Sequence, residues 1–176
     1  MAVRVEEIDR LLDSTSTVGT DVPVERIRVW RDELAHVAVL LAYARHVLSV
    51  DVRVLREAVD SPGTSFTATV ESLPRTLATA SLGGGWSLSP DSPATMASAE
   101  QLADGEADEL LALHMKIASA DIAKPSDLEP LVTELETQLA EVTQRWESAE
   151  ARLRNLQSQL VAKYKTGEAS VDDWLR

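Results

Sequence analysis

The 176-residue sequence contains no cysteine, which excludes disulfide bonds and thiolate chemistry. No stretch approaches the roughly 20 apolar residues that a membrane-spanning helix needs. Residues 1–12 also lack the unbroken apolar run of a signal peptide. These absences predict a cytoplasmic protein that has no membrane partner.

Basic residues are scarce as well, because 17 Lys and Arg stand against 29 Asp and Glu, giving a net charge of -12. This charge disfavours direct binding to nucleic acid or to an anionic membrane, and it favours a basic protein as partner. Aromatic residues make up only 4% of the chain, while Ala, Leu, Val and Glu are abundant. Such a composition is typical of long helices rather than sheets.

Two long segments have apolar residues at alternating steps of three and four. The first, residues 24–60, contains neither proline nor glycine, and the second, residues 125–166, contains neither after Pro130. Steps of three and four trace one seam of a coiled coil. Because a helix of this length needs a comparably long partner, the two segments predict a helical hairpin.

The rest of the chain predicts shorter elements. Residues 61–124 read as an irregular connection with short helices, and residues 168–176 as a C-terminal mini-helix capped by Ser170 with Asp173 three residues later. The fold prediction is therefore all-α: a single helical domain over residues 1–176, built as a long antiparallel helical hairpin (coiled coil) with additional short helices.

No pattern of catalytic or metal-binding residues is evident. His36, His46 and His114 are the only imidazoles, and their spacing does not suit zinc. No Gly-x-Ser-x-Gly or phosphate-loop pattern occurs, and Glu134 and Glu141 lie one heptad apart without a cleft that raises the pKa of a carboxyl group. We therefore expect no enzyme, no metal site and no cofactor.

Four stretches, in this order, carry a resemblance to a known family: "EEIDRLL", "VERIRVWRDEL" leading into "AYARHVLSVDVRVL", "VESLPRTLATA", and "LRNLQSQLVAKYKTGEASVDDWLR". Together they span most of the chain, and the closing Gly-Glu-Ala-Ser-Val-Asp is the most specific part. They resemble the actinobacterial aerial mycelium formation family of RsiG-like anti-sigma factors. The resemblance implies an antiparallel coiled coil that binds a sigma factor.

The same resemblance implies a cyclic di-GMP site, because each long helix of the family carries Glu-x3-Ser-x2-Arg-x3-Gln-x3-Asp. Placing Tyr43 and Tyr164 on the family's pattern assigns its positions to Ala38, Ala42, Arg45, Ser49 and Arg53, and to Leu139, Thr143, Trp146, Glu150 and Arg154. Only Arg45 matches, and Thr143 is merely similar. Polar groups of the nucleotide left unpaired here would cost about 1–3 kcal/mol each. These positions are therefore predicted to be non-functional.

The substitutions suggest that packing replaces the nucleotide. If the helices are in register, the large Leu139 and Trp146 fill the space beside the small alanines at 38 and 42. Two ion pairs are expected between the helices: Arg45 with Glu150, and Asp51 with Arg154.

We therefore predict an anti-sigma factor that sequesters a sigma factor independently of cyclic di-GMP, as a monomer in a one-to-one complex. Val171, Trp174 and Leu175 of the tail are the predicted partner contacts. Two alternatives remain open. One is a structural coiled-coil protein that self-associates; the other is a nucleotide-responsive regulator in which Arg45 and Arg53, with Arg154, bind a different phosphate ligand.

Overall fold

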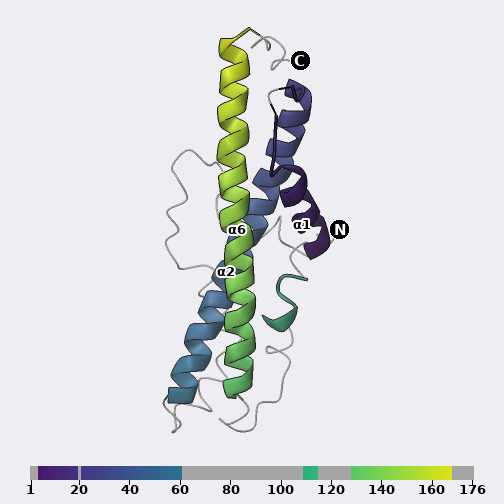
Figure 1. Cartoon of the computed structure of the whole chain (residues 1–176). Coiled ribbons are helices and arrows are strands. Elements are labelled where there is room, and N and C mark those ends of the chain that lie inside the picture. Colours follow the sequence, from purple (N-terminus) through teal and green to yellow (C-terminus); the bar gives the residue numbers. More distant parts are fainter. Residues whose placement is uncertain (1–3, 20, 61–108, 115–127, 168–176) are drawn as a thin grey trace. The chain divides into compact units, whose positions relative to one another are not determined.

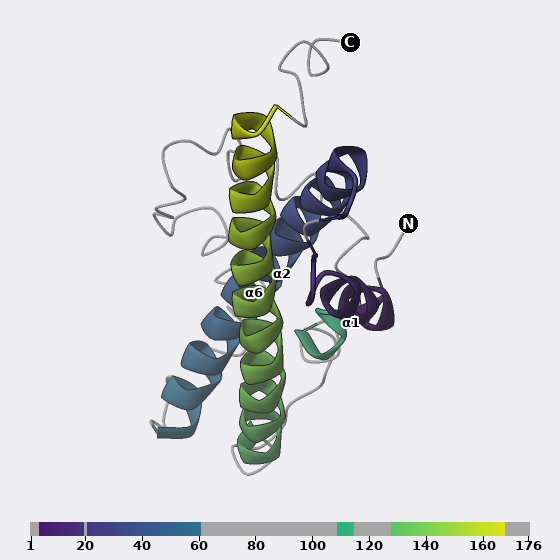
Figure 2. The same cartoon turned by 45° about the horizontal axis from the view of Figure 1, so that its top comes forward.

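The computed structural model describes residues 4–19, 21–60, 109–114 and 128–167 (Figure 1). They form three helices: α1 (Val5–Ser14), α2 (Val24–Asp60) and α6 (Leu128–Lys165). Residues 109–114 add a short helical turn, and none of the described residues lies in a strand. Both long helices are continuous between their bounds, as a second view also shows (Figure 2). The all-α prediction is confirmed.

The two long helices pack against each other and run antiparallel. Arg56, near the C-terminus of α2, forms an ion pair with Glu136 in the first third of α6. Arg28, near the N-terminus of α2, instead donates a hydrogen bond to the hydroxyl of Tyr164 at the far end of α6. These pairs confirm the predicted helical hairpin.

The buried face of α2 follows a seven-residue repeat. Five residues with no exposed surface recur at that interval: Ile27, Leu34, Leu41, Leu48 and Leu55. A second buried row lies three positions further along: Val37, Ala44, Asp51 and Ala58. Two inward positions in every seven make a coiled-coil seam, and Asp51 is the polar residue in it.

The partner helix α6 has the same repeat. One buried row consists of Leu128, Leu135, Val142, Ala149, Leu156 and Lys163. A second row, four positions further along, is buried or half-buried: Val132, Leu139, Trp146, Leu153 and Leu160. Pro130 lies in the first turn of the helix, where the missing N–H of proline has no intrahelical partner to lose.

The ends of the long helices follow from the neighbouring residues. The carbonyl of Pro23, immediately before α2, accepts hydrogen bonds from the N–H groups of Arg26 and Ile27. After α6, Gly167 has a φ of 77°, a left-handed conformation that favours glycine. The predicted mini-helix of residues 168–176 lies outside the described residues, as does most of the predicted connection.

The chain groups into two compact units, each containing part of both long helices. The described part of the terminal unit consists of residues 4–39 and 144–167, and that of the central unit of residues 40–60, 109–114 and 128–143. The terminal unit includes α1, which buries Ile8 and Leu12. The central unit includes the helical turn, which buries Leu110, Leu111 and Leu113.

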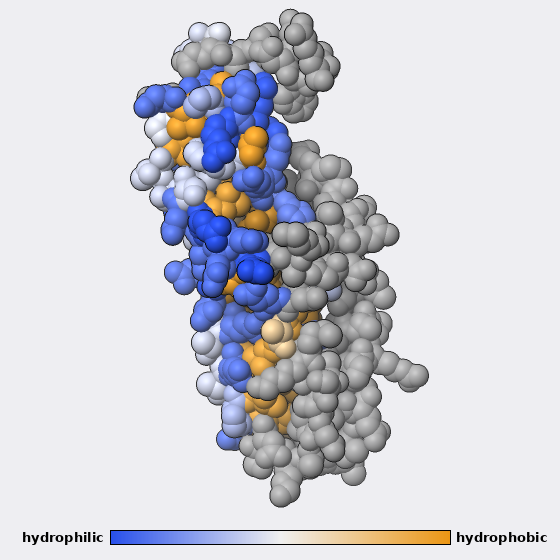
Figure 3. Space-filling model, turned by 90° about the vertical axis from the view of Figure 1, so that its right-hand side faces the viewer, coloured by the Kyte–Doolittle hydropathy of each residue, from blue (hydrophilic) through white to orange (hydrophobic). Residues whose placement is uncertain are grey.

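Hydrophilic side chains cover much of the described surface that Figure 3 shows, with hydrophobic side chains visible between them. Val29 and Val161 are the large hydrophobic residues that stand most exposed within the described part, at 46% and 52%. No described helix combines the length and the apolarity that crossing a membrane requires.

Candidate functional site

The ten positions that the resemblance assigns to a nucleotide lie in mixed surroundings. Along α2, Ala38 is buried, Ala42 and Arg45 are half-buried, and Ser49 and Arg53 are exposed. On α6 the first four positions are half-buried and the last is exposed: Leu139, Thr143, Trp146, Glu150 and Arg154. Leu139 and Trp146 belong to the second seam row of α6, so both have a packing role in the hairpin.

Within each unit, the register of the hairpin contradicts the hypothesis that large residues of α6 fill space beside the small residues of α2. In the terminal unit, Arg28 meets Tyr164, so Ala38 is level with Arg154. Trp146 lies eight residues further along α6, a distance of about 12 Å at 1.5 Å per residue.

The same comparison applies in the central unit. Arg56 meets Glu136 there, which places Leu139 level with Arg53, and Ala42 lies about 16 Å from that level along α2. Neither large residue is therefore level with the small residue of its own unit. Packing between residues of the same unit was therefore a wrong expectation, because seams with the same seven-residue period can be paired in several registers. Packing of Ala42 against Trp146, which belong to different units, stays a prediction.

The expected ion pair between Asp51 and Arg154 is also wrong. Nδ1 of His114 lies 2.8 Å from Oδ2 of Asp51, while Nε of Arg154 donates to the carbonyl of Glu150 in its own helix. The expected pairing of Arg45 with Glu150 stays a prediction.

The contact between Asp51 and His114, called here the Asp51–His114 clasp, places a buried carboxylate against an imidazole within the central unit. The side chain of Asp51 is 1% exposed and that of His114 is 19% exposed. The other carboxylate oxygen, Oδ1, is buried and has no hydrogen-bond partner. A carboxylate removed from water needs hydrogen-bond partners in place of the lost water. The imidazole of His114 supplies one for Oδ2 and so compensates part of the free-energy cost of burying Asp51.

Further contacts hold the helical turn in the central unit. The amide Nε2 of Gln138 on α6 donates to the carbonyl of Leu110 at 3.0 Å. Leu110, Leu111 and Leu113 are each less than 9% exposed. The turn is therefore attached to α2 through the clasp and to α6 through Gln138.

Sequence reasoning missed this clasp, although a signal for it exists. A strict seven-residue step from Val37 leads through Ala44 to Asp51 and Ala58. The apolar pattern instead continues to Val52, which is half-buried, and so hides the carboxylate in the seam. No local pattern identifies His114 as its partner, because 63 residues separate them.

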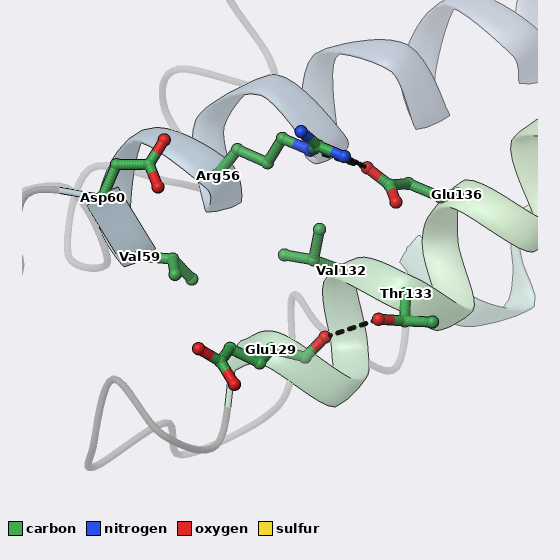
Figure 4. A pocket seen from close by; sticks show the side chains of 7 residues that line it. All are labelled: Arg56, Val59, Asp60, Glu129, Val132, Thr133 and Glu136. Atoms are coloured by element: carbon green, nitrogen blue, oxygen red, sulfur yellow. Dashed lines mark hydrogen bonds and ion pairs between the residues drawn. The ribbon is translucent and has the colours of Figure 1, made fainter.

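One cavity of the central unit, of about 310 Å³, lies where α2 ends and α6 begins (Figure 4). Val59 and Val132 extend into the space between the helices, and the ion pair of Arg56 with Glu136 spans them on one side. Asp60, Glu129 and Thr133 complete the lining. Three carboxylates against one guanidinium repel an anion, so this cavity does not favour a phosphate ligand.

A second cavity, of about 460 Å³, is lined by the helical turn and by one face of α6. We call it the turn groove, and its lining residues are Ala112, Leu113, Glu134, Thr137, Gln138 and Glu141. None of the ten positions assigned to the nucleotide lines the turn groove or the cavity of Figure 4.

The terminal unit is held by polar contacts between distant residues. The guanidinium of Arg145 on α6 donates to both carboxylate oxygens of Asp9 on α1, at 2.9 and 3.3 Å. Nε2 of Gln159 donates to the carbonyl of Val18, in the segment between α1 and α2, at 3.0 Å. These contacts attach α1 and the segment after it to α6.

The hydrogen bond between Arg28 and Tyr164 gives a testable prediction. Nη2 of Arg28 lies 2.6 Å from the Tyr164 hydroxyl in a part-buried position. Tyr164→Phe keeps the ring but removes the acceptor, so we expect the free energy of unfolding to fall by about 1 kcal/mol. Urea unfolding followed by circular dichroism measures it.

A matched control for that variant is Ser158→Ala, which removes an exposed hydroxyl that bonds to a carbonyl of the same helix. We expect a change below about 0.5 kcal/mol for this control. Equal effects of the two variants would contradict a stabilising role for the Arg28–Tyr164 bond.

Within residues 4–19, 21–60, 109–114 and 128–167, no group of three or more acidic, histidine or cysteine side chains is placed to hold a metal ion. The predicted partner contacts Val171, Trp174 and Leu175 lie outside these residues.

Comparisons of the chain with protein-family models, with curated proteins and with solved structures give no match. The resemblance to RsiG-like anti-sigma factors is therefore a prediction from the sequence.

Proposed function

We propose that this chain is an anti-sigma factor that sequesters a sigma factor in a one-to-one complex, in the cytoplasm and independently of cyclic di-GMP. The resemblance described above suggests the class of partner. The hairpin supplies two long, rigid helices of the kind that present a continuous binding surface.

The observation that carries the proposal is the uneven charge of α6. Residues 128–144 contain four glutamates, at positions 129, 134, 136 and 141, and neither Lys nor Arg. Residues 145–165 contain five Lys or Arg and two Glu. Three of the four glutamates in the first half are exposed, and the fourth, Glu136, is paired with Arg56.

An acidic helix face is complementary to the basic surface with which a sigma factor binds DNA. Complementary potentials accelerate encounter and select against wrong partners. A sigma factor covered in this way is prevented from engaging the promoter. The same negative charge disfavours nucleic acid itself as the partner.

The experiment is reconstitution with purified components. The chain is mixed with each sigma factor encoded in the source genome, and the mass of each complex is measured by light scattering after size exclusion. We expect a one-to-one complex with at least one sigma factor, and loss of transcription from its promoter when the chain is added. A stable dimer of the chain that binds no sigma factor would overturn the proposal and favour the structural coiled-coil alternative.

Independence from cyclic di-GMP is tested separately by calorimetry. Because the family positions hold Ala38, Leu139 and Trp146 in place of polar ligands, we expect no heat of binding when the nucleotide is titrated into the chain. We also expect the affinity for the sigma factor to be the same with and without the nucleotide. Binding that requires the nucleotide would contradict this part of the proposal.

A further inference from the structure

We propose that the turn groove is the docking site for a basic amphipathic helix of the protein partner. An apolar side chain of that helix enters the cavity, and its Lys or Arg side chains reach the carboxylates of Glu134 and Glu141. The proposal rests on the proposed function only in taking a basic protein as the partner.

The groove has the geometry of a helix-binding face. Glu134, Thr137, Gln138 and Glu141 follow each other at steps of three, one and three, and therefore share one face of α6. Glu134 and Glu141 are seven residues apart, which is about 10.5 Å along the helix axis. A partner helix lying along α6 presents cations at the same spacing when they are also seven residues apart.

The apolar residues that line the groove come from the helical turn. Leu113 is 7% exposed, and Ala112 beside it is exposed. The volume of about 460 Å³ gives room for an apolar side chain of a partner helix. Apolar anchors at steps of three and four are the way in which an amphipathic helix occupies such a groove.

The lining of the turn groove contains two glutamates and no Lys or Arg, which favours a cationic occupant. Residues 128–144 of α6 contain no Lys or Arg, and Arg56 of α2 is paired with Glu136. A carboxylate has two oxygens and about four acceptor positions, so each glutamate accepts a partner's cation in addition to contacts within the chain.

The position of the turn explains why the groove exists. The Asp51–His114 clasp and the bond from Gln138 to Leu110 hold the turn in the central unit. Gln138 therefore fixes one wall of the groove while its neighbour Thr137 stays exposed on the same face. The docking surface is consequently composed of two segments that are far apart in the sequence.

The test uses the full chain and a fluorescent helical peptide of leucines and lysines, with the lysines spaced seven residues apart. The variant Glu134→Lys/Glu141→Lys reverses both charges of the groove. Its matched control, Glu33→Lys/Glu147→Lys, makes the same change in net charge at exposed positions of the terminal unit. Circular dichroism confirms that both variants keep their helices.

We expect the groove variant to bind the peptide roughly ten- to hundredfold more weakly than the unsubstituted chain, and the control to change the affinity by less than about threefold. Equal weakening in both variants shows that only the overall charge matters and overturns the proposal. Absence of peptide binding to the unsubstituted chain also overturns it.

A label provides an independent measurement, because the chain has no cysteine and a single substitution creates a unique site. Thr137→Cys in the groove and Ser158→Cys in the terminal unit both replace exposed residues of α6. We expect bound peptide to protect the first from a thiol reagent and to leave the second reactive. Equal reactivity at the two sites with peptide bound contradicts docking in the groove.

The peptide also separates this proposal from the proposed function. If the groove variant binds a sigma factor as tightly as the control does, the proposal that the turn groove is the docking site is overturned, and the proposed function is unaffected. Failure to form a complex with any sigma factor would contradict the proposed function, while the peptide result would still decide the groove.

Discussion

Replacing His114 with alanine is expected to lower the free energy of unfolding by about 3 kcal/mol. The side chain of Asp51 is 1% exposed, and His114 supplies the contact to its Oδ2. Removing one partner of a buried pair costs about 3–5 kcal/mol, because it leaves a charge uncompensated. The 19% exposure of His114 admits water to the site, so we expect a value at the lower end. Urea unfolding followed by circular dichroism gives the free energy.

Two further variants separate the clasp from simple loss of packing. His114→Asn keeps an amide donor close to the position of Nδ1, and we expect it to recover about half of the lost stability. Asp51→Leu/His114→Leu replaces both partners with apolar side chains, and such a double replacement of a buried polar pair is often neutral or stabilising. A loss of less than about 0.5 kcal/mol in His114→Ala would contradict the argument that the imidazole compensates the buried carboxylate.

The second large effect is expected at Leu135. This residue has no exposed surface and lies in the first seam row of α6. Leu135→Ala removes three carbon atoms from a closely packed seam and leaves a cavity, so we expect a loss of about 2–5 kcal/mol in the free energy of unfolding. The same urea titration measures it, with the midpoint falling while the slope stays unchanged.

Leu139→Ala is the matched control for Leu135, because it makes the same chemical change one helical turn away. Leu139 is half-buried and lies in the second seam row, so the vacated space is open to water. We expect about half the effect seen at Leu135, since less apolar area is lost from the interior. If Leu139→Ala lowers the free energy of unfolding as much as Leu135→Ala does, the first seam row of α6 is not the centre of the seam.

The carboxylate of Asp51 lies in the seam of α2. A polar residue at a seam position lowers the stability of a coiled coil and can fix its register. In this chain Asp51 is paired with the helical turn rather than with α6. The clasp therefore specifies where the connecting turn docks, which is also what forms the turn groove.

The proposed docking surface differs from the site that the resemblance implies. The family's positions follow a stripe along each long helix, and in this chain they include the seam residues Leu139 and Trp146. The turn groove is built by a different face of α6, with Glu134, Thr137, Gln138 and Glu141, and by residues 112–113 of the connection. The proposed partner binding therefore relies on the charge of the α6 surface rather than on the positions that the resemblance assigns to a nucleotide.

The sequence by itself determined the helices and their approximate ends. Three local features act here. No proline or glycine interrupts the helix between Val24 and Asp60, and its apolar residues recur at steps of three and four. Gly167, directly after α6, adopts the left-handed conformation that ends that helix. Local propensity and periodicity act within one helix, so one sequence suffices to show them. The uneven charge of α6, which carries the functional proposal, is visible in the same way.

Only the tertiary structure decided the register, the clasp and the groove. The two seams share a seven-residue period and can be paired at several offsets, and contacts such as Arg28 with Tyr164 are what distinguish between them. The partner of Asp51 lies 63 residues away, beyond the range of any local pattern. The position of residues 112–113 beside α6 also depends on the tertiary structure. The leucines of the turn are buried against surfaces that exist only in the folded hairpin.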